Sequence, residues 1–392
     1  MPKVTREQIL VYRLHGHRLT DRAPAADLTG VAGRCYPQNT PPGAAGLALA
    51  ARVHEVTEER ITAELDGKRL LQAFGARGAP HVFPARDAAV FTRGLLPETE
   101  EELRAFLRGA VPSLDRIGLA ATDLAGLAAE AVKEILDGTA LVKDDLGRRA
   151  GELITDRLPA GQRDGWQGHS PYSAQQFLGE SLVRFALPVV SLRGILCHGG
   201  RQGRSPLLRR TDQWAGAIKG GLEKAPGELV ERFLRCYGPA TPAHLAEWGG
   251  IGRAQAERLW EAAEPGLAEV ESGGGPRWVL KGELGRLESP EEVKGVRLLP
   301  PHDPYLQARD RQVLLPDRDR RKALWRTIGG PGAVLVDGDI RAVWRPKTRR
   351  RTLDVAVEPL GRLGAKHRAP IGEEAARVAA FRGLELGELS GC

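Results

Sequence analysis

Apolar residues recur at helical spacing in the first part of the chain and predict a series of helices. Residues 5–19 begin with Thr5, a good N-cap residue, and continue with a broad apolar face. Residues 44–53 and the stretch from Thr57 predict two further helices, whereas the proline- and glycine-rich residues 30–43 predict a loop. Residues 70–84 then have β character around a glycine turn. Three helices followed by such a hairpin is the order of a winged helix.

A second series of elements starts near residue 98. Acidic residues 98–102 open a helix, and residues 122–136, 143–158 and 173–187 have helical patterns, with a loop expected at 161–168. Residues 192–208 then place apolar strands on both sides of a basic glycine turn. The order again resembles helices followed by a wing.

The third series has the clearest winged-helix pattern. It contains a helix at 228–237, a short helix from Thr241, a Gly-Gly turn, a helix at 253–264 and a hairpin at 270–280. This succession is that of a winged helix-turn-helix.

The pattern changes to strands from residue 296. Residues 333–336 and 340–344 flank the dipeptide Asp337-Gly338, a strong hairpin signal, and a turn at 346–351 leads to a third strand. From residue 372 we expect a short amphipathic helix with residues 391–392 frayed. The predicted fold is therefore α+β, with three tandem winged-helix units supported by a barrel-like antiparallel β module. The predicted boundaries are 1–95, 96–220, 221–290, 291–371 and 372–392.

Composition narrows the possible partners. The 392 residues carry a net charge of +7, mostly through arginine, which favours an anionic partner such as nucleic acid. No apolar run reaches the roughly 18 residues that a membrane span needs, and the N-terminus lacks the apolar core of a signal peptide. The four cysteines are far apart, so we expect no zinc site and no disulfide framework. We also expect no cofactor. We expect a monomer in the cytoplasm, associated with the nucleoid.

The densest basic segment lies in the β module. Residues 340–353 contain no acidic residue and carry the candidate DNA contacts Arg341, Arg345, Lys347, Arg349, Arg350 and Arg351. A β-supported finger of this kind can contact phosphates. The alternative is an ordinary solvated hairpin tip. Arg201 and Arg204 form a second, weaker basic turn.

Motifs across nearly the whole chain resemble one protein family, the AlkZ/YcaQ-type winged-helix DNA glycosylases. In order, these motifs are Leu47-Ala-Leu-Ala-Ala-Arg52, Arg77-Gly78 with His81, Tyr237-Gly-Pro-Ala-Thr-Pro242, Asp303-Pro-Tyr305, Arg309-Asp-Arg311, Val336-Asp-Gly338 and Trp344-Arg345. The resemblance implies cleavage of the N-glycosidic bond of alkylated purines, including bulky adducts and crosslinks. It also implies a basic channel for double-stranded DNA and DNA contact by a β-hairpin.

The family's catalytic mark is a Gln-x-Gln or Gln-x-Asp triplet just before the Leu-Ala-Leu helix. Without gaps, this triplet corresponds to Gln38, Asn39 and Thr40, so the first glutamine matches and threonine replaces the second polar residue. In a shifted register, Gln38 takes the second place and Tyr36 the first. One member of the triplet is missing in either register.

Such a loop is chemically sufficient for a charged substrate. An N7-alkylguanine already carries positive charge, so its departure needs little protonation, and the enzyme must mainly position a water molecule. Gln38 and Thr40 can do so, but the triplet lacks a carboxylate that would act as a strong general base. The alternatives are that the triplet only satisfies backbone groups in a turn, or that the protein binds DNA without catalysis.

Three histidines are weaker candidates for a functional role than the triplet. His15 and His17 lack companions at metal-ligand spacing, so we expect them at the surface. Arg77 and His81, in the first predicted hairpin, are further candidate DNA contacts. For His81, phosphate contact and packing within the hairpin both remain open.

Overall fold

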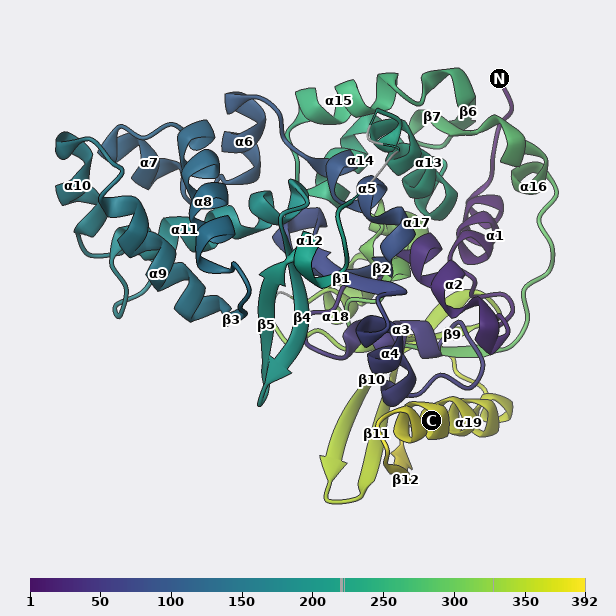
Figure 1. Ribbon diagram of the computed structural model, residues 1–392. Helices are drawn as coiled ribbons and strands as arrows, with labels where there is room; N and C mark the ends of the chain where they lie inside the picture. Colours follow the sequence, from purple (N-terminus) through teal and green to yellow (C-terminus); the bar gives the residue numbers. More distant parts are fainter. Residues whose placement is uncertain (219–220, 222, 327, 392) are drawn as a thin grey trace. The chain divides into compact units, whose positions relative to one another are not determined.

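The computed structural model describes residues 1–218, 221, 223–326 and 328–391. The chain folds into two compact units, each assembled from segments that are distant in the sequence (Figure 1). Unit 1 comprises residues 1–64, 230–245 and 264–392, and unit 2 comprises residues 65–229 and 246–263. Three helices span the boundaries between these segments, namely α4 (Glu58–Asp66), α13 (Ala225–Tyr237) and α14 (Pro242–Gly249). Within the described residues, no helix is long and apolar enough to cross a membrane.

Unit 1 combines an N-terminal group of helices with a C-terminal sheet. Its helices are α1 (Arg6–Gly16), η1 (Ala25–Asp27), α2 (Leu28–Cys35), α3 (Ala44–Ala50), η5 (Glu264–Gly266), η6 (Lys281–Glu283), α16 (Leu284–Glu288), η7 (Pro304–Gln307), α17 (Arg311–Leu314), α18 (Arg318–Leu324), η8 (Ala365–His367) and α19 (Arg368–Phe381). Its strands are β6 (Leu267–Ser272), β7 (Gly275–Leu280), β8 (Val296–Leu299), β9 (Gly332–Val336), β10 (Asp339–Arg349), β11 (Thr352–Pro359) and β12 (Glu385–Ser390).

The N-terminal helix confirms the prediction made from its capping residue and apolar face. Thr5 accepts a hydrogen bond from the backbone of Gln8, and the Gln8 side chain accepts one from the Thr5 backbone. This reciprocal capping box satisfies two N–H groups that a helix start leaves unpaired. The apolar face packs, through Ile9 and Tyr12, against the β6–β7 hairpin.

Helix α2 includes the first part of residues 30–43, where we expected a loop throughout, so that prediction is wrong for this part. Gly30 and Gly33 lie inside this helix. At Gly30 a Cβ would approach Asp27 Oδ1 to 2.1 Å, so the glycine here gives room to a neighbouring carboxylate. The helix ends at Tyr36, which has the left-handed φ of 48°.

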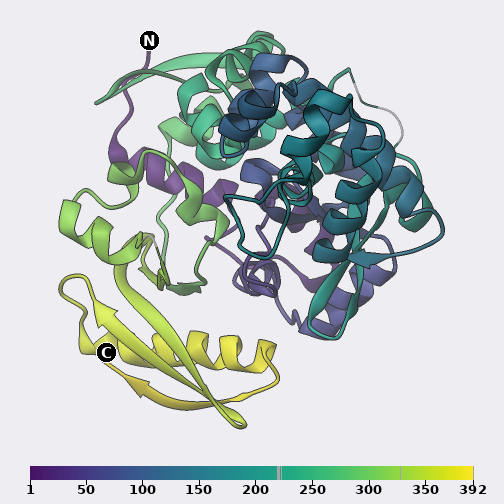
Figure 2. The same ribbon diagram turned by 90° about the vertical axis from the view of Figure 1, so that its left-hand side faces the viewer.

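The C-terminal strands form a five-stranded sheet in the order β12-β11-β10-β9-β8. Neighbouring strands are antiparallel except β11 and β12, which are parallel. Helix α19 lies along one face, where Ile371, Ala375 and Ala379 pack on the strands (Figure 2). The barrel-like module that we expected is wrong, because the end strands β8 and β12 are not paired with each other within the described residues. The predicted helical tail is also incomplete, since β12 follows α19; Cys392 lies outside the described residues.

The hairpin formed by β10 and β11 is longer than the sequence predicts. We expected a turn at 346–351, but pairing continues to Arg349 opposite Thr352, and only Arg350 and Arg351 form the turn. Arg350 has the left-handed φ of 41° that this tight turn requires. The hairpin projects beyond the rest of its sheet (Figure 1). The predicted Asp337-Gly338 turn between β9 and β10 is confirmed.

Unit 2 contains most of the helices of the middle of the chain. Its elements are β1 (Leu70–Phe74), η2 (Ala76–Gly78), β2 (Pro80–Pro84), η3 (Ala85–Asp87), α5 (Ala88–Phe91), η4 (Arg93–Leu95), α6 (Glu100–Phe106), α7 (Val111–Ile117), α8 (Ala121–Ile135), β3 (Leu141–Val142), α9 (Lys143–Thr155), α10 (Ala160–Gln167), α11 (Leu178–Leu192), β4 (Leu196–Gln202), β5 (Ser205–Arg210), α12 (Thr211–Trp214) and α15 (Arg253–Glu261). Helices α8, α9 and α11 share one apolar core.

Helix α10 is a second correction, because we expected a loop at 161–168. Trp166 on this helix is fully buried, and its indole N–H donates to the carbonyl of Gly151 at 2.9 Å. A Cβ at Gly165 would lie 2.7 Å from Ile117, so this glycine also serves close packing within a helix.

The two hairpins predicted as separate wings join one sheet. Strands β1 and β4 pair through Gln72 and His198, which gives the order β2-β1-β4-β5-β3. Ser191 reinforces the junction, since its hydroxyl accepts from the backbone of Phe74 and donates to the carbonyl of Leu196. The hairpins β1–β2, β4–β5 and β6–β7 occur where predicted, whereas the division into three tandem winged helices stays a prediction.

Candidate functional site

The Gln38–Thr40 loop connects α2 to α3 in unit 1. Asn39 Oδ1 accepts hydrogen bonds from the backbone N–H groups of Gly43, at 2.9 Å, and Ala45, at 3.3 Å. These bonds hold the loop against the start of α3, where backbone N–H groups lack helical partners. Gln38 is half-buried and Thr40 is exposed. Asn39, the middle residue of the triplet, therefore anchors the loop. Of the two outer residues, Thr40 is more exposed to solvent than Gln38.

A buried ion pair fixes the chain just beyond the other end of α3. Arg52 and Asp303 are both inaccessible to solvent and form two bonds, Nη1 to Oδ2 at 2.7 Å and Nη2 to Oδ1 at 2.6 Å. Burial alone would lower the pKa of Arg52, but the charge of Asp303 outweighs it and raises that pKa above its ordinary value. The guanidinium also donates to the carbonyls of His17 and Ala48. This pair joins two motifs on which the family resemblance rests, the one that ends at Arg52 and the one that begins at Asp303.

A second buried charge cluster was missed from the sequence. Arg13 binds Asp310 through two bonds, at 2.7 and 2.8 Å, and Arg277 binds the same carboxylate at 2.5 Å. Burial would raise the pKa of Asp310, but Arg13 and Arg277 hold it well below its ordinary value. The cluster connects α1, β7 and the Arg309-Asp-Arg311 motif. The available signal was Arg13 itself, a charged residue on the apolar face of α1.

His17 corrects the expectation that both N-terminal histidines lie at the surface. His17 is fully buried, and its ring meets the rings of Tyr237 and Tyr305 edge-on at 5.0 and 5.5 Å between centroids. Within the described residues, neither ring nitrogen has a hydrogen-bond partner. Burial, together with the charges of Arg52 and Arg13, holds the pKa of His17 well below its ordinary value, so the ring is neutral. His15 is partly exposed and lies 3.3 Å from Glu291.

The basic residues of the β10–β11 hairpin divide into two groups. Those at the tip are exposed, namely Lys347, Arg349, Arg350 and Arg351. Arg341 and Arg345 lie nearer the base, where Arg341 pairs with Asp339 at 3.0 Å and Arg345 donates to the carbonyl of Gly329 at 2.9 Å. The tip therefore concentrates positive charge on a rigid support.

In the β1–β2 hairpin of unit 2, the two candidate DNA contacts are less exposed to solvent than the residues at the tip of the β10–β11 hairpin. Arg77 is half-buried, and its guanidinium donates to the carbonyl of Trp248. His81 is only 3% exposed, and burial lowers its pKa to about 3. Its Nδ1 lies 2.9 Å from the carbonyl of Ala79. Of the two readings of His81, packing within the hairpin agrees with this geometry, whereas a buried neutral ring is a poor phosphate ligand.

The turn between β4 and β5 keeps both of its predicted contacts at the surface. Arg201 and Arg204 are exposed, and Arg201 donates to the carbonyl of Arg204 at 2.5 Å. Behind this turn, Trp214 packs on Gly199, where a Cβ would lie 2.5 Å from the indole. The ammonium of Lys68 lies over the same ring.

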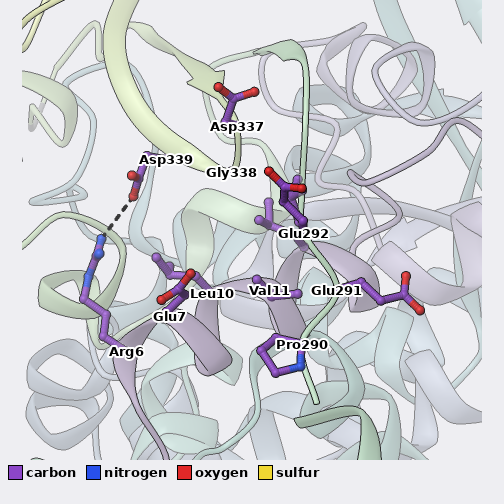
Figure 3. A pocket seen from close by; sticks show the side chains of 12 residues that line it. Arg6, Glu7, Leu10, Val11, Pro290, Glu291, Glu292, Asp337, Gly338 and Asp339 are labelled. Atoms are coloured by element: carbon purple, nitrogen blue, oxygen red, sulfur yellow. Dashed lines mark ion pairs between the residues drawn. The ribbon is translucent and has the colours of Figure 1, made fainter. Parts of the chain in front are cut away.

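A hollow of about 570 Å³ in unit 1 has the opposite charge (Figure 3). Arg6 pairs with Asp339 across it, at 3.6 Å. The other charged side chains that line it are acidic, namely Glu7, Glu291, Glu292 and Asp337. Acidic groups repel phosphates, so this side of unit 1 is unsuited to DNA.

Comparisons with known proteins agree with the resemblance seen in the motifs. A family model described as DNA glycosylase AlkZ-like matches residues 31–381. Among solved structures, the chain is similar to the Streptomyces sahachiroi DNA glycosylase AlkZ, with a TM-score of 0.76, 24% identity and coverage of 99% of each chain. No curated protein matches the chain. At this identity, the likeness to the solved structure shows a common fold.

Proposed function

The chain belongs to the AlkZ-like DNA glycosylase family, and on that premise we propose that it releases N7-alkylated purines from double-stranded DNA. As a DNA glycosylase it is a hydrolase of N-glycosyl bonds. The proposal adds the class of damaged base and the residues that act on it. We further propose that its substrates include bulky adducts and crosslinks. In this proposal the protein acts as a monomer and is associated with the nucleoid.

The observation that carries the proposal is the anchoring of the Gln38–Thr40 loop through Asn39. With the Asn39 carboxamide engaged by two backbone N–H groups, we assign it the role of a positioning residue. Gln38 and Thr40 then supply the polar groups that hold a water molecule against the anomeric carbon. Water adds to that carbon and loses one proton to the solvent, while the base leaves as a neutral molecule with the electrons of the N-glycosidic bond.

The absence of a carboxylate from the triplet sets the substrate class. Amide and hydroxyl groups orient water but remove its proton poorly. An N7-alkylated purine is already cationic and departs as a neutral base, so it needs little general catalysis. Uncharged bases are expected to be poor substrates.

DNA is proposed to contact the exposed tip of the β10–β11 hairpin and the turn at Arg201 and Arg204. Both turns carry exposed arginines, which suit phosphate oxygens. Arg77 supports the proposal less directly, because its guanidinium is engaged by the carbonyl of Trp248.

The test is base release from duplex DNA containing N7-methylguanine, measured as abasic sites. We expect Gln38→Ala to slow release by about one to three decades, the cost typical of losing one electrostatic donor, with duplex affinity nearly unchanged. Thr40→Ala is expected to slow it less, and Thr40→Gln to maintain or raise the rate. Thr62→Ala, at an exposed threonine of α4, is the matched control. Fully active Gln38→Ala, or a wild-type protein that binds duplex but releases no base, would overturn the proposal.

A further inference from the structure

Two cations converge on one aromatic side chain at the base of the β4–β5 hairpin. The ammonium of Lys68 lies 2.9 Å, and the guanidinium carbon of Arg209 4.7 Å, from the centre of the Trp214 ring. We call these three side chains the tryptophan–cation cluster. All three belong to unit 2 and are half-buried. Because both cations lie against one ring, they are also close to each other.

The backbone of β4 and β5 holds this cluster in place. Gly199 lies against the Trp214 ring, where a Cβ would be 2.5 Å from the indole, so a larger residue would displace the ring. The pairing of β4 with β5 shifts register between His198 and Arg201, as at a β-bulge, and bulges redirect side chains. Arg209 Nε donates to the carbonyl of Gly199 at 2.9 Å. The indole and the guanidinium are therefore positioned by the hairpin itself.

The positive charge of the tryptophan–cation cluster is not neutralised by an ion pair. Across the described part of the chain, neither Lys68 nor Arg209 forms a salt bridge. Burial lowers the pKa of Lys68, and the charge of Arg209 lowers it further; Asp66 opposes both effects without outweighing them. Asp212, close by on α12, is engaged by Arg210 through two bonds, at 3.1 and 2.7 Å. Two cations held close together repel each other, and a bound anion removes that cost.

The donors of the cluster suit a phosphate group. Among the residues that the structure describes, the terminal nitrogens of Arg209 have no partner, and they form the planar fork that matches phosphate oxygens. Lys68 adds a compact positive charge with three donors. Because Gly199 and Lys68 lie against its ring, Trp214 is a poor platform for a stacked base. The cluster therefore suits a phosphate and not a nucleobase.

The position of Arg209 indicates where the phosphate comes from. Arg209 lies on β5, five residues after Arg204 in the exposed basic turn. Five residues of a strand cover about 17 Å. That length corresponds to about five nucleotide steps of roughly 3.4 Å along DNA. One DNA strand can therefore follow the β4–β5 hairpin from its turn to the cluster.

We propose that Lys68 and Arg209, held against Trp214, form a phosphate-binding site that takes a backbone phosphate of DNA. The assignment to DNA rests on the proposed function, whereas the affinity for phosphate rests on the cluster alone. A phosphate held there fixes the β4–β5 hairpin on the DNA strand without adding sequence preference.

The test measures the salt dependence of binding to undamaged duplex DNA in chloride. Lys68→Met removes the charge but leaves an apolar chain of similar length over the indole. Loss of one phosphate contact lowers the slope of log K against log salt by about 0.9. Across a fourfold change in salt, the ratio of wild-type to variant affinity should therefore change by about 3.5-fold. Arg209→Gln is expected to lower the slope as well.

A charge-preserving variant separates contact with DNA from a purely structural role. Lys68→Arg keeps the positive charge over the indole and is expected to keep the wild-type slope. Lys294→Met, which removes one exposed lysine paired with Glu292, should also leave the slope unchanged. Melting curves of all variants report their folding.

A separate arm titrates the wild type and Lys68→Met with inorganic phosphate by calorimetry. A lower slope in Lys68→Met, with the wild-type slope in Lys68→Arg, supports the site and assigns it to the DNA strand. An unchanged slope, with phosphate binding by the wild type that Lys68→Met loses, supports a site for free phosphate. An unchanged slope without phosphate binding, or an equal loss of slope in both Lys68 variants, overturns the proposal. Because undamaged duplex is used, failure here is distinct from failure to release N7-methylguanine.

Discussion

The exposed tip of the β10–β11 hairpin leads to a quantitative prediction about DNA binding. Arg350 and Arg351 form the turn itself and are exposed, so both can reach phosphates. Each phosphate contact contributes about 0.9 to the slope of log K against log salt. Replacing both arginines with alanine should therefore lower the slope by about 1.8. Between 50 and 200 mM salt, the affinity ratio of wild type to variant should then fall by about 12-fold.

Arg349 provides an internal comparison, because it is exposed yet already has a partner. Its Nε lies 2.6 Å from Asp354 Oδ2 across the hairpin. That ion pair competes with a phosphate, so Arg349→Ala should lower the slope by less than 0.9. Asp354→Asn should have the opposite effect, since it frees Arg349 for DNA and raises affinity at low salt.

The assay is a series of duplex-binding isotherms by fluorescence anisotropy at several chloride concentrations. Lys294→Ala serves as the control for loss of one positive charge outside the hairpin. Undamaged duplexes of different sequence should bind alike, because phosphate contacts carry no direct base information. If the slope of the Arg350→Ala, Arg351→Ala double variant equals that of the wild type, the hairpin tip does not contact DNA.

Two further predictions concern stability. Asp303→Asn should lower the free energy of unfolding by about 3–5 kcal/mol in urea titrations, because it leaves the charge of Arg52 buried and unpaired; a smaller loss would mean that the pair is dispensable. His17→Phe should make the protein less sensitive to acid. The neutral ring of His17 takes up a proton mainly on unfolding, so the wild type loses up to about 1.4 kcal/mol for each pH unit below about 6.5. Equal pH dependence of both proteins, measured by urea unfolding between pH 7 and 5, would contradict this reasoning.

The hydrophobic and polar pattern predicted an element correctly where residues close together in the chain determine that element. The capping box at Thr5, the Asp337-Gly338 turn and the order of α13, α14, α15, β6 and β7 all follow from residues close together in the chain. The basic character of the β10–β11 tip was also apparent, although pairing continues to Arg349 and shortens the turn to two residues.

The misassigned loops show where local reasoning fails. Glycine usually signals a turn, but at Gly30 and Gly165 it allows close packing inside a helix. A Cβ would meet Asp27 at 2.1 Å in the first case and Ile117 at 2.7 Å in the second. The contact at Gly165 involves a residue 48 positions earlier in the chain, which no local pattern contains.

The buried charges were beyond sequence reasoning for a similar reason. Arg52 and Asp303 are 251 residues apart, and Arg13 and Asp310 are 297 apart. Arg13 gave a signal, as a charged residue on the apolar face of α1, whereas the other three residues are of types that usually lie at a surface. Only the fold brings the opposite charges together and excludes water from them.

The contacts of Asn39 and of the Arg52–Asp303 pair allow an effect on catalysis to be distinguished from an effect on folding. Asn39 anchors this loop through two hydrogen bonds, and the chain beyond α3 is fixed by Arg52 and Asp303. Asn39→Ala removes two hydrogen bonds, each contributing about 1 kcal/mol, and should both destabilise the loop and slow base release. Gln38→Ala and Thr40→Ala leave these anchors intact. A slower release with unchanged melting in those two variants therefore reports the positioning of water, whereas a parallel loss of stability and rate would assign the whole triplet to the fold.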